Sequence, residues 1–370
     1  MNNPIQAYQQ IARDQQLDAL ALVPGSNFSR LFKKEFHQNE RPLVVFIPAE
    51  GAPCAVVPNL ELGSFAQINF EGDVFDWRDQ SGYQSAFDAS LSTQPFKRIG
   101  VEGQVMRVFV HHAIKSALPN CELVDAQVPI ASLRLHKTED ELTAMRRAIA
   151  ISEQSLSDTI EQLRVGMTET QIESFLVQRL LANGANEMAF SPIVAASTNS
   201  AKPHASARSD YAIKAGDALL FDFGARYQGV CADITRTFFI DHCDDRQQAI
   251  YNTVLDANLA GIKASKPGAT AHDVDDAATG VLEASDFADR VRTKTGHGLG
   301  RDIHEDPYIM RGNQQVLEPG MVFTVEPGLY QLEDFGVRIE DDVLITDAGA
   351  ESLTTFSKQL QVLCTSKAAP

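Results

Sequence analysis

Residues 219–240 have the sequence LLFDFGARYQGVCADITRTFFI, and this stretch decides how the rest of the chain is interpreted. Apolar residues on both sides of a polar, glycine-containing break predict the two strands of a hairpin. Asp222 and Asp233 lie at equal distances from the centre of that break, between Tyr227 and Gln228. A symmetric hairpin would make the two carboxylates cross-strand neighbours, with Cβ atoms about 5 Å apart. Because like charges repel in such apolar surroundings, another group must offset the repulsion.

A second hairpin of the same kind lies in MVFTVEPGLYQLEDFGVRIEDDVLIT, residues 321–346. Its strand-like ends flank a looser break near Glu333, and Glu326 and Glu340 are equidistant from that break. Taken singly, each of these acids is more typical of a turn or a solvated face, as in the acidic run Glu340-Asp341-Asp342. The joint arrangement of two opposed carboxylate pairs instead favours a site for two divalent cations, which need bridging oxygen ligands.

Composition indicates a globular protein that is large enough for two domains. The chain has 370 residues, of which 44% are hydrophobic and 22% charged, and its formal net charge is −17 at pH 7. That acidic balance argues against a nucleic-acid groove or an anionic membrane surface as partner. The first residues lack the apolar core of a secretory signal, and five scattered cysteines fit reduced thiols. We therefore expect a cytoplasmic protein.

The chain divides into two expected domains. Residues 1–134 alternate apolar runs at 19–23, 42–48 and 52–58 with helical stretches such as 105–118, which predicts a smaller α/β accessory domain. A boundary follows near His136-Lys137, and residues 137–370 form the second domain. Its first helix begins with the capping box from Thr138 to Glu141 and keeps one face apolar for about 25 residues.

The second domain contains an internal repeat. RVGMTETQI (164–172) and KPGATAHDV (266–274) share Gly-x-Thr, with an apolar residue four positions after the threonine. Each begins the second helix of a pair, the first of them with a capping box from Thr168 to Gln171, and each pair leads into an apolar strand region. The matching order indicates a duplication. Between the two hairpins, TGHGLGRDIHEDP (295–307) places His297 between glycines, which leave room for a ligand, and His304 seven residues later.

These motifs, FDFG…ADITRTF, GHGLG…HEDP, FTVEPGLY and VRIEDDVLIT, closely resemble the pita-bread metallopeptidases of the Xaa-Pro dipeptidase (prolidase) and aminopeptidase P branch. The resemblance covers about residues 137–365. It implies an α/β (α+β) fold, with a duplicated pita-bread domain behind a creatinase-type accessory domain. The branch commonly forms homodimers, so a homodimer is expected as well.

The resemblance also implies the site residues. The metal ligands would be Asp222, Asp233, His297, Glu326 and Glu340, with Asp233 and Glu340 bridging two ions. His204 (in Lys202-Pro203-His204), His304 and Arg338 would lie beside them. Two positions depart from the family pattern: Ala205 stands where glycine is usual, and Val230 where an aromatic residue is common. Both departures bear on substrate fit.

The implied chemistry is attack of a metal-bridging hydroxide on the amide bond that precedes proline, with Glu326 carrying the proton and His204 or His304 stabilising the oxyanion. One imidazole among carboxylates favours Mn(II) or Co(II) over Zn(II). Alternatives are a pita-bread hydrolase of a non-peptide solute such as an ectoine derivative, a non-catalytic peptide-binding member, and a methionine aminopeptidase. The sequence does not distinguish a dipeptidase from an aminopeptidase.

Overall fold

The computed structural model describes residues 4–94 and 96–364. The chain divides between Arg134 and Leu135 into two compact units. The outer ends of the two expected domains, residues 1–3 and 365–370, lie outside the described residues. Both units mix helices and strands, so the predicted α/β fold class is confirmed.

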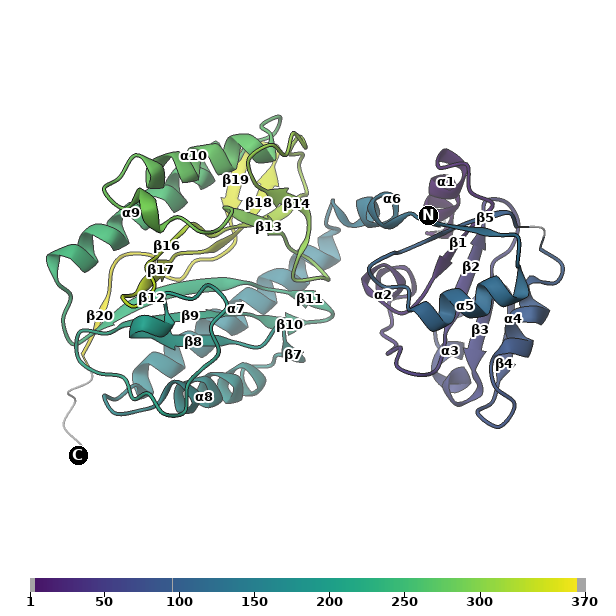
Figure 1. Ribbon diagram of the computed structural model, residues 1–370, viewed down its shortest axis with the longest axis horizontal. Helices are drawn as coiled ribbons and strands as arrows, with labels where there is room; N and C mark the ends of the chain where they lie inside the picture. Colours follow the sequence, from purple (N-terminus) through teal and green to yellow (C-terminus); the bar gives the residue numbers. More distant parts are fainter. Residues whose placement is uncertain (1–3, 95, 365–370) are drawn as a thin grey trace. The chain divides into compact units, whose positions relative to one another are not determined.

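The first unit is built around one mixed sheet of strand order β4-β3-β2-β1-β5-β6 (Figure 1). Its elements are α1 (Ile5–Asp14), β1 (Ala19–Leu22), α2 (Ser26–Phe32), β2 (Val44–Pro48), β3 (Cys54–Pro58), α3 (Leu62–Ala66), β4 (Asp73–Trp77), α4 (Gln84–Leu91), β5 (Arg98–Val101), α5 (Val108–Ala117), β6 (Glu122–Asp125) and α6 (Gln127–Ala131). Strands β1, β2 and β3 confirm the three apolar runs expected as strands. Helix α5 begins three residues later than expected, because Arg107 is extended.

The second unit contains the paired helices and both hairpins. Its elements are α7 (Glu139–Gln162), α8 (Glu169–Ala182), β7 (Glu187–Met188), β8 (Ile193–Ala196), β9 (Ala218–Phe223), β10 (Ala225–Tyr227), β11 (Val230–Cys231), β12 (Ile234–Ile240), α9 (Asp245–Ala264), α10 (Ala271–Glu283), β13 (Gly296–Gly298), β14 (Glu305–Ile309), β15 (Val322–Val325), β16 (Gly328–Tyr330), β17 (Gly336–Arg338), β18 (Asp341–Thr346), β19 (Gly349–Ser352) and β20 (Val362–Leu363).

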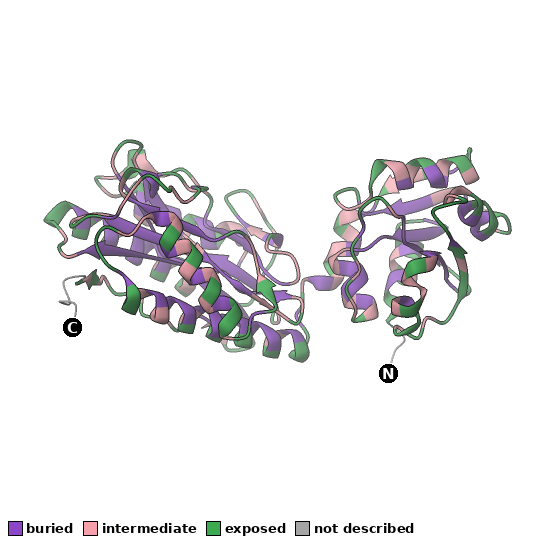
Figure 2. Cartoon of the chain, turned by 90° about the horizontal axis from the view of Figure 1, so that it is seen from below, coloured by how far each residue is buried: buried purple, intermediate pink, exposed green. Residues whose placement is uncertain are grey.

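Each half of this unit lays a helix pair on a sheet, which agrees with the duplication read from the sequence. Helices α7 and α8 lie against the sheet of order β20-β12-β9-β8, and α9 and α10 against the sheet of order β14-β13-β15-β18-β19. Figure 1 shows the strands between the two helix pairs, and Figure 2 shows that the strands are buried while the outer helix faces are exposed. The two sheets therefore meet in the middle of the unit, away from the solvent-facing helices.

The helix starts follow the predicted capping chemistry. Thr138 caps α7 through a full capping box with Glu141, and Thr168 caps α8 through one with Gln171. Such boxes satisfy backbone N–H groups that the first helical turn leaves without partners. Among the described residues, no helix is both long enough and apolar enough to cross a membrane.

Candidate metal centre

The five predicted ligands lie at or beside strand ends in the two sheets. Asp222 is the penultimate residue of β9, Asp233 directly precedes β12, and His297 is the middle residue of β13. Glu326 directly follows β15, and Glu340 directly precedes β18. Because β12 and β18 approach each other where the halves meet, the Glu340 backbone N–H donates to the Thr235 carbonyl at 3.2 Å. The duplicated strands thus bring acids from both halves together.

The turn of the first hairpin differs from the expected one. Tyr227 pairs with Val230, so the turn consists of Gln228 and Gly229, with φ values of +50° and +76°. Positive φ at both central positions is the two-residue turn whose twist suits a hairpin, and glycine tolerates it best. The centre of symmetry therefore lies one residue further along the chain than the sequence suggested.

This shift changes the partner of Asp222. In the β9–β12 pair, Asp222 lies opposite Thr235, so the predicted direct pairing of Asp222 with Asp233 is wrong. Asp233 lies two positions from Thr235 and therefore on the same face of the hairpin, diagonal to Asp222. Diagonal neighbours are about 7–8 Å apart. That separation leaves space for a cation between the carboxylates.

The second hairpin has the predicted register. Val325 pairs with Asp341 and Gly328 pairs with Arg338, so the residues between them, Glu326 and Glu340, face each other. The loop closes around Glu333 with φ of +67°. The second pair of carboxylates is therefore opposed as the symmetry of the sequence indicated.

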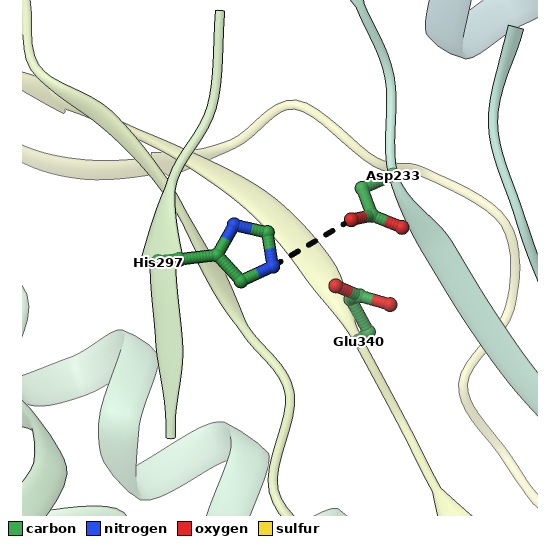
Figure 3. A group of neighbouring side chains, drawn as sticks. All are labelled: Asp233, His297 and Glu340. Atoms are coloured by element: carbon green, nitrogen blue, oxygen red, sulfur yellow. Dashed lines mark ion pairs between the residues drawn. The ribbon is translucent and has the colours of Figure 1, made fainter. Parts of the chain in front are cut away.

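Asp233, His297 and Glu340 converge on one point. One potential ligand atom from each lies within 4.8 Å of the others, and all three side chains are buried. Figure 3 shows the imidazole edge of His297 directed toward both carboxylates, with His297 Nε2 at 3.7 Å from Asp233 Oδ2. Glu326 joins them, because its Oε1 lies 3.3 Å from the same nitrogen. These groups come from four separate chain segments.

The carboxylates of this cluster lack the partners that buried acids need. Burial and the neighbouring acids raise the pKa of Asp233 well above its usual range, and they do the same for Glu340. Asp233 Oδ1 and Glu340 Oε1 are buried and have no hydrogen-bond partner among residues 4–94 and 96–364. A divalent cation would replace the lost hydration and neutralise the charge, so the residues fit a metal site.

His297 is prepared to act as a neutral ligand. Burial, followed by the neighbouring His304, lowers the pKa of His297 to about 3. Its Nδ1 lies 3.2 Å from the Gly298 carbonyl oxygen, so Nδ1 carries the proton and donates there. The other nitrogen, Nε2, then presents a lone pair to the carboxylate cluster. A fixed tautomer of this kind is what metal-binding histidines use.

Asp222 forms an ion pair with an arginine beside this cluster. Arg338 Nη2 donates to Asp222 Oδ2 in a buried ion pair. The same guanidinium donates through Nε to Thr235 Oγ1 at 3.1 Å and through Nη1 to Tyr330 Oη at 2.7 Å. Thr235 Oγ1 in turn donates to Glu340 Oε2 at 2.6 Å. Arg338 therefore connects the carboxylates of the two hairpins.

Glu326 has the electrostatics of a group that can exchange a proton near neutral pH. Burial raises the pKa of Glu326 to about 7, against the opposing effect of Arg338. Its Oε1 lies 3.3 Å from His297 Nε2 and accepts a hydrogen bond from Thr324 Oγ1 at 3.5 Å.

Both predicted accessory histidines are exposed. The ring centroid of His304 is 4.2 Å from that of His297, and burial lowers the pKa of His304, with smaller contributions from Lys294 and His204. His204 is exposed, on the loop between β8 and β9. The preceding carbonyl, of Pro203, accepts a hydrogen bond from Arg338 Nη2 at 3.5 Å. That bond ties this loop to the site.

Three neighbours of the site were missed by the sequence reasoning. Thr235 could have been found, because it lies two residues after Asp233 and so shares its face of the strand. Asp342 is buried and accepts a hydrogen bond from the Asp233 backbone at 3.2 Å. The run Glu340-Asp341-Asp342 is therefore buried, and the alternative that it forms a solvated face is wrong. Lys294 had no signal at all, since its proximity to Glu326 follows only from the tertiary fold.

The two departures from the family pattern lie in packed positions. Ala205 follows His204 and is buried in a small cluster with Ile193, Ala195 and Leu220. Val230 is buried in the main core at the start of β11. Both are therefore packing residues beside the site.

A curved pair of duplicated sheets that converges on buried carboxylates and one neutral histidine defines a metallohydrolase. The family models agree with that description. Residues 143–347 match Metallopeptidase family M24, and residues 4–136 match the Creatinase/Prolidase N-terminal domain. The chain belongs to metallopeptidase family M24, and it is a peptidase that uses divalent metal.

Solved structures of the same fold cover nearly the whole chain. A prolidase from Thermococcus sibiricus is 31% identical with a TM-score of 0.92, over 98% of this chain and 100% of that one. An Xaa-Pro dipeptidase from Bacillus anthracis is 28% identical with a TM-score of 0.89, over 97% and 99%. An X-Pro aminopeptidase from Thermotoga maritima is 28% identical with a TM-score of 0.83, over 97% and 99%. The predicted pita-bread fold and metallopeptidase class are confirmed.

Proposed function

We propose that this chain hydrolyses the Xaa-Pro amide bond of dipeptides or short peptides with two divalent metal ions. The ligands would be Asp222, Asp233, His297, Glu326 and Glu340. The observation that carries the proposal is that Asp233, His297 and Glu340 place potential ligand atoms within 4.8 Å of one another, while both acids keep a buried oxygen that has no hydrogen-bond partner among the described residues. The resemblance to prolidases and Xaa-Pro peptidases supports the choice of bond.

Divalent cations bound there would make water nucleophilic near neutral pH and would stabilise negative charge on the scissile carbonyl oxygen. The protein groups have separate tasks around that chemistry. Glu326, as general base and then general acid, takes a proton from the attacking water and delivers it to the leaving proline nitrogen. His304 and His204 donate hydrogen bonds to the oxyanion that develops on the carbonyl.

Arg338 positions two of the carboxylates rather than binding substrate. Its guanidinium is only 3% exposed and donates to Asp222, Thr235, Tyr330 and the Pro203 carbonyl. These four hydrogen bonds fix the orientation of Asp222 and, through Thr235, of Glu340. Orientation of this kind matters because misplacement of a catalytic group by about 1 Å can cost 10²-fold in rate.

The proline specificity has a chemical rationale. The Xaa-Pro bond is a tertiary amide without an N–H, so peptidases that recognise that N–H bind it poorly. A site that relies on carboxylates and histidines around the carbonyl does not need the missing donor. Mn(II) or Co(II), a cytoplasmic location and a homodimer stay predictions, to be measured by metal analysis, fractionation and light scattering.

The test is hydrolysis of Ala-Pro, Leu-Pro, Ala-Pro-Ala and Met-Ala-Ser by chelated enzyme, with and without added Mn(II). Metal-dependent cleavage of the two dipeptides alone would establish an Xaa-Pro dipeptidase, and cleavage of Ala-Pro-Ala an Xaa-Pro aminopeptidase. Cleavage of Met-Ala-Ser alone, or of none of the four by metal-loaded protein, would refute Xaa-Pro specificity. Glu351→Gln, which removes a surface ion pair with Arg146, should keep the wild-type activity and is the control for the variants below.

A further inference from the structure

A buried acid outside the ligand set organises the loop that carries His204. Glu169 is the first residue of helix α8 and its side chain is fully buried. Its Oε1 accepts from the Ala196 backbone N–H at 2.7 Å, and its Oε2 accepts from the Arg208 backbone N–H at 2.7 Å. These two amides are the ends of the segment 196–208, so one carboxylate closes the base of that loop.

Further bonds from the same carboxylate stiffen the loop. Arg208 forms a fork on Glu169, with Nε at 3.0 Å from Oε2 and Nη2 at 2.8 Å from Oε1. Asn199 Nδ2 donates to Glu169 Oε2 at 2.9 Å and to the Ser206 carbonyl at 2.9 Å. A forked, charge-assisted pair is the most directional bond available to an arginine. Glu169 therefore holds both the ends and the interior of the loop.

The top of the loop reaches the metal cluster. Ser200 Oγ accepts from the Gly336 backbone N–H at 3.0 Å, and the Pro203 carbonyl accepts from Arg338. His204 follows Pro203 and is exposed. Anchorage at the base by Glu169 and at the top by the second hairpin thus determines where the imidazole can lie.

The second half of the unit uses the same device. Asp275 is buried on helix α10, and its Oδ1 accepts from the Thr295 backbone N–H at 2.8 Å. The Thr295 carbonyl accepts from the Glu326 backbone at 2.7 Å, and Thr295 precedes His297 by two residues. In each half, therefore, a buried acid on the second helix holds the segment that carries a site histidine. The two acids occupy different positions on their helices, so the two halves share this way of holding a loop but not the position of the acid in the repeat.

We infer that Glu169 is a positioning residue for His204, acting through the loop 196–208 rather than through metal binding. This inference rests on the proposed function for the role of His204. Glu169→Gln keeps the size of the side chain but turns an NH₂ group toward the donors of Arg208, so the base of the loop opens. Metal content should stay that of the wild type. The kcat for an Xaa-Pro dipeptide should fall by about tenfold or more, because the histidine is misplaced.

Two readouts separate positioning from general destabilisation. In Glu169→Gln, hydrogen exchange should rise in peptides covering residues 197–208 while α7 and β12 keep their protection. A double-mutant cycle with His204→Ala should be non-additive, since a displaced histidine has little activity left to lose. Arg208→Gln removes the same forked ion pair by changing its partly exposed member, Arg208, instead of the buried Glu169. It should give the same two results with a smaller loss of stability. Glu351→Gln is the surface control for both.

Unchanged exchange in residues 197–208, or a His204→Ala cost equal in both backgrounds, would overturn the inference. Failure of the proposed function looks different. In that case the wild-type enzyme cleaves no Xaa-Pro peptide, or His204→Ala costs nothing in the wild type, and the exchange comparison alone decides whether Glu169 holds the loop.

Discussion

Asp233 is a residue whose burial opposes its negative charge. It is 4% exposed, Glu340, Asp222, Asp342 and Glu326 all raise its pKa, and one of its oxygens has no partner. In the ionised form such a carboxylate destabilises the fold unless a cation lies beside it. The same feature that makes the position unfavourable without metal makes it a strong ligand.

Asp233→Asn should therefore separate metal binding from stability. We expect metal occupancy and hydrolysis to fall by about 100-fold or more. The metal-free variant should be more stable to urea near neutral pH than the metal-free wild type, because the amide carries no charge to desolvate. Plasma emission spectroscopy, peptide assays and urea titrations measure the three quantities. Retained hydrolysis at normal rate would contradict the assigned role.

Thr235 gives a second residue-level prediction. Its hydroxyl donates to Glu340 and accepts from Arg338, so Thr235→Val should weaken metal affinity by roughly 10–100-fold, as loss of an outer hydrogen bond to a ligand does. Calorimetric titration with Mn(II) measures the effect. Thr159→Val is the matched control, because that buried hydroxyl bonds only within helix α7, to the Ser155 carbonyl. Equal affinities in the two variants would count against the hydrogen-bond account.

At the scale of elements, the first hairpin depends on its turn. Gly229 has φ of +76°, which an alanine adopts only with strain, so Gly229→Ala should destabilise the protein by about 1 kcal/mol. Gln228→Asn should be neutral or stabilising, because Asn-Gly is the preferred dipeptide for this turn. Urea titrations of both variants test the pair. An alanine variant as stable as the asparagine variant would contradict the turn assignment.

The same hairpin shows which parts of the structure the sequence could predict. Capping boxes and apolar periodicity placed α7 and α8 correctly, because those signals are local. The second hairpin was predicted in register, because its acids flank a loop centred on Glu333. The first was not, because Gln228-Gly229 as a two-residue turn is decided by backbone angles that the symmetric count ignored.

The long-range contacts at the site could not be predicted from the sequence. Arg338 was expected near the metals by resemblance, yet its ion pair with Asp222 follows from the meeting of β9 with β17, which no local pattern specifies. Glu169 carried only the signal of a helix start, although it accepts bonds from residues up to 39 positions away. The hydrogen-bond partners of polar groups buried by tertiary packing therefore cannot be predicted from local sequence patterns.

For the whole molecule, the metal cluster links stability to pH. Asp233, Glu340 and Glu326 have folded-state pKa values raised by burial, the last to about 7, above the value of about 4 in an unfolded chain. Between these values the metal-free folded protein binds more protons than the unfolded chain, so its stability falls as pH rises. His297, with its pKa lowered to about 3, and His304, whose pKa burial also lowers, act in the opposite direction, but they are two groups against three.

Chelated protein should therefore lose stability from about pH 5 to about pH 7.5, by up to about 1.4 kcal/mol per pH unit for each net proton released. Metal-loaded protein should not show this loss, since bound cations keep the carboxylates ionised, so the increase in melting temperature on adding Mn(II) should grow with pH. Urea and thermal titrations across that range measure both. Asp233→Asn removes one of the three carboxylates, and its chelated form should show a shallower slope. Parallel curves for chelated and metal-loaded wild type would mean that these acids find other partners and do not need the metal.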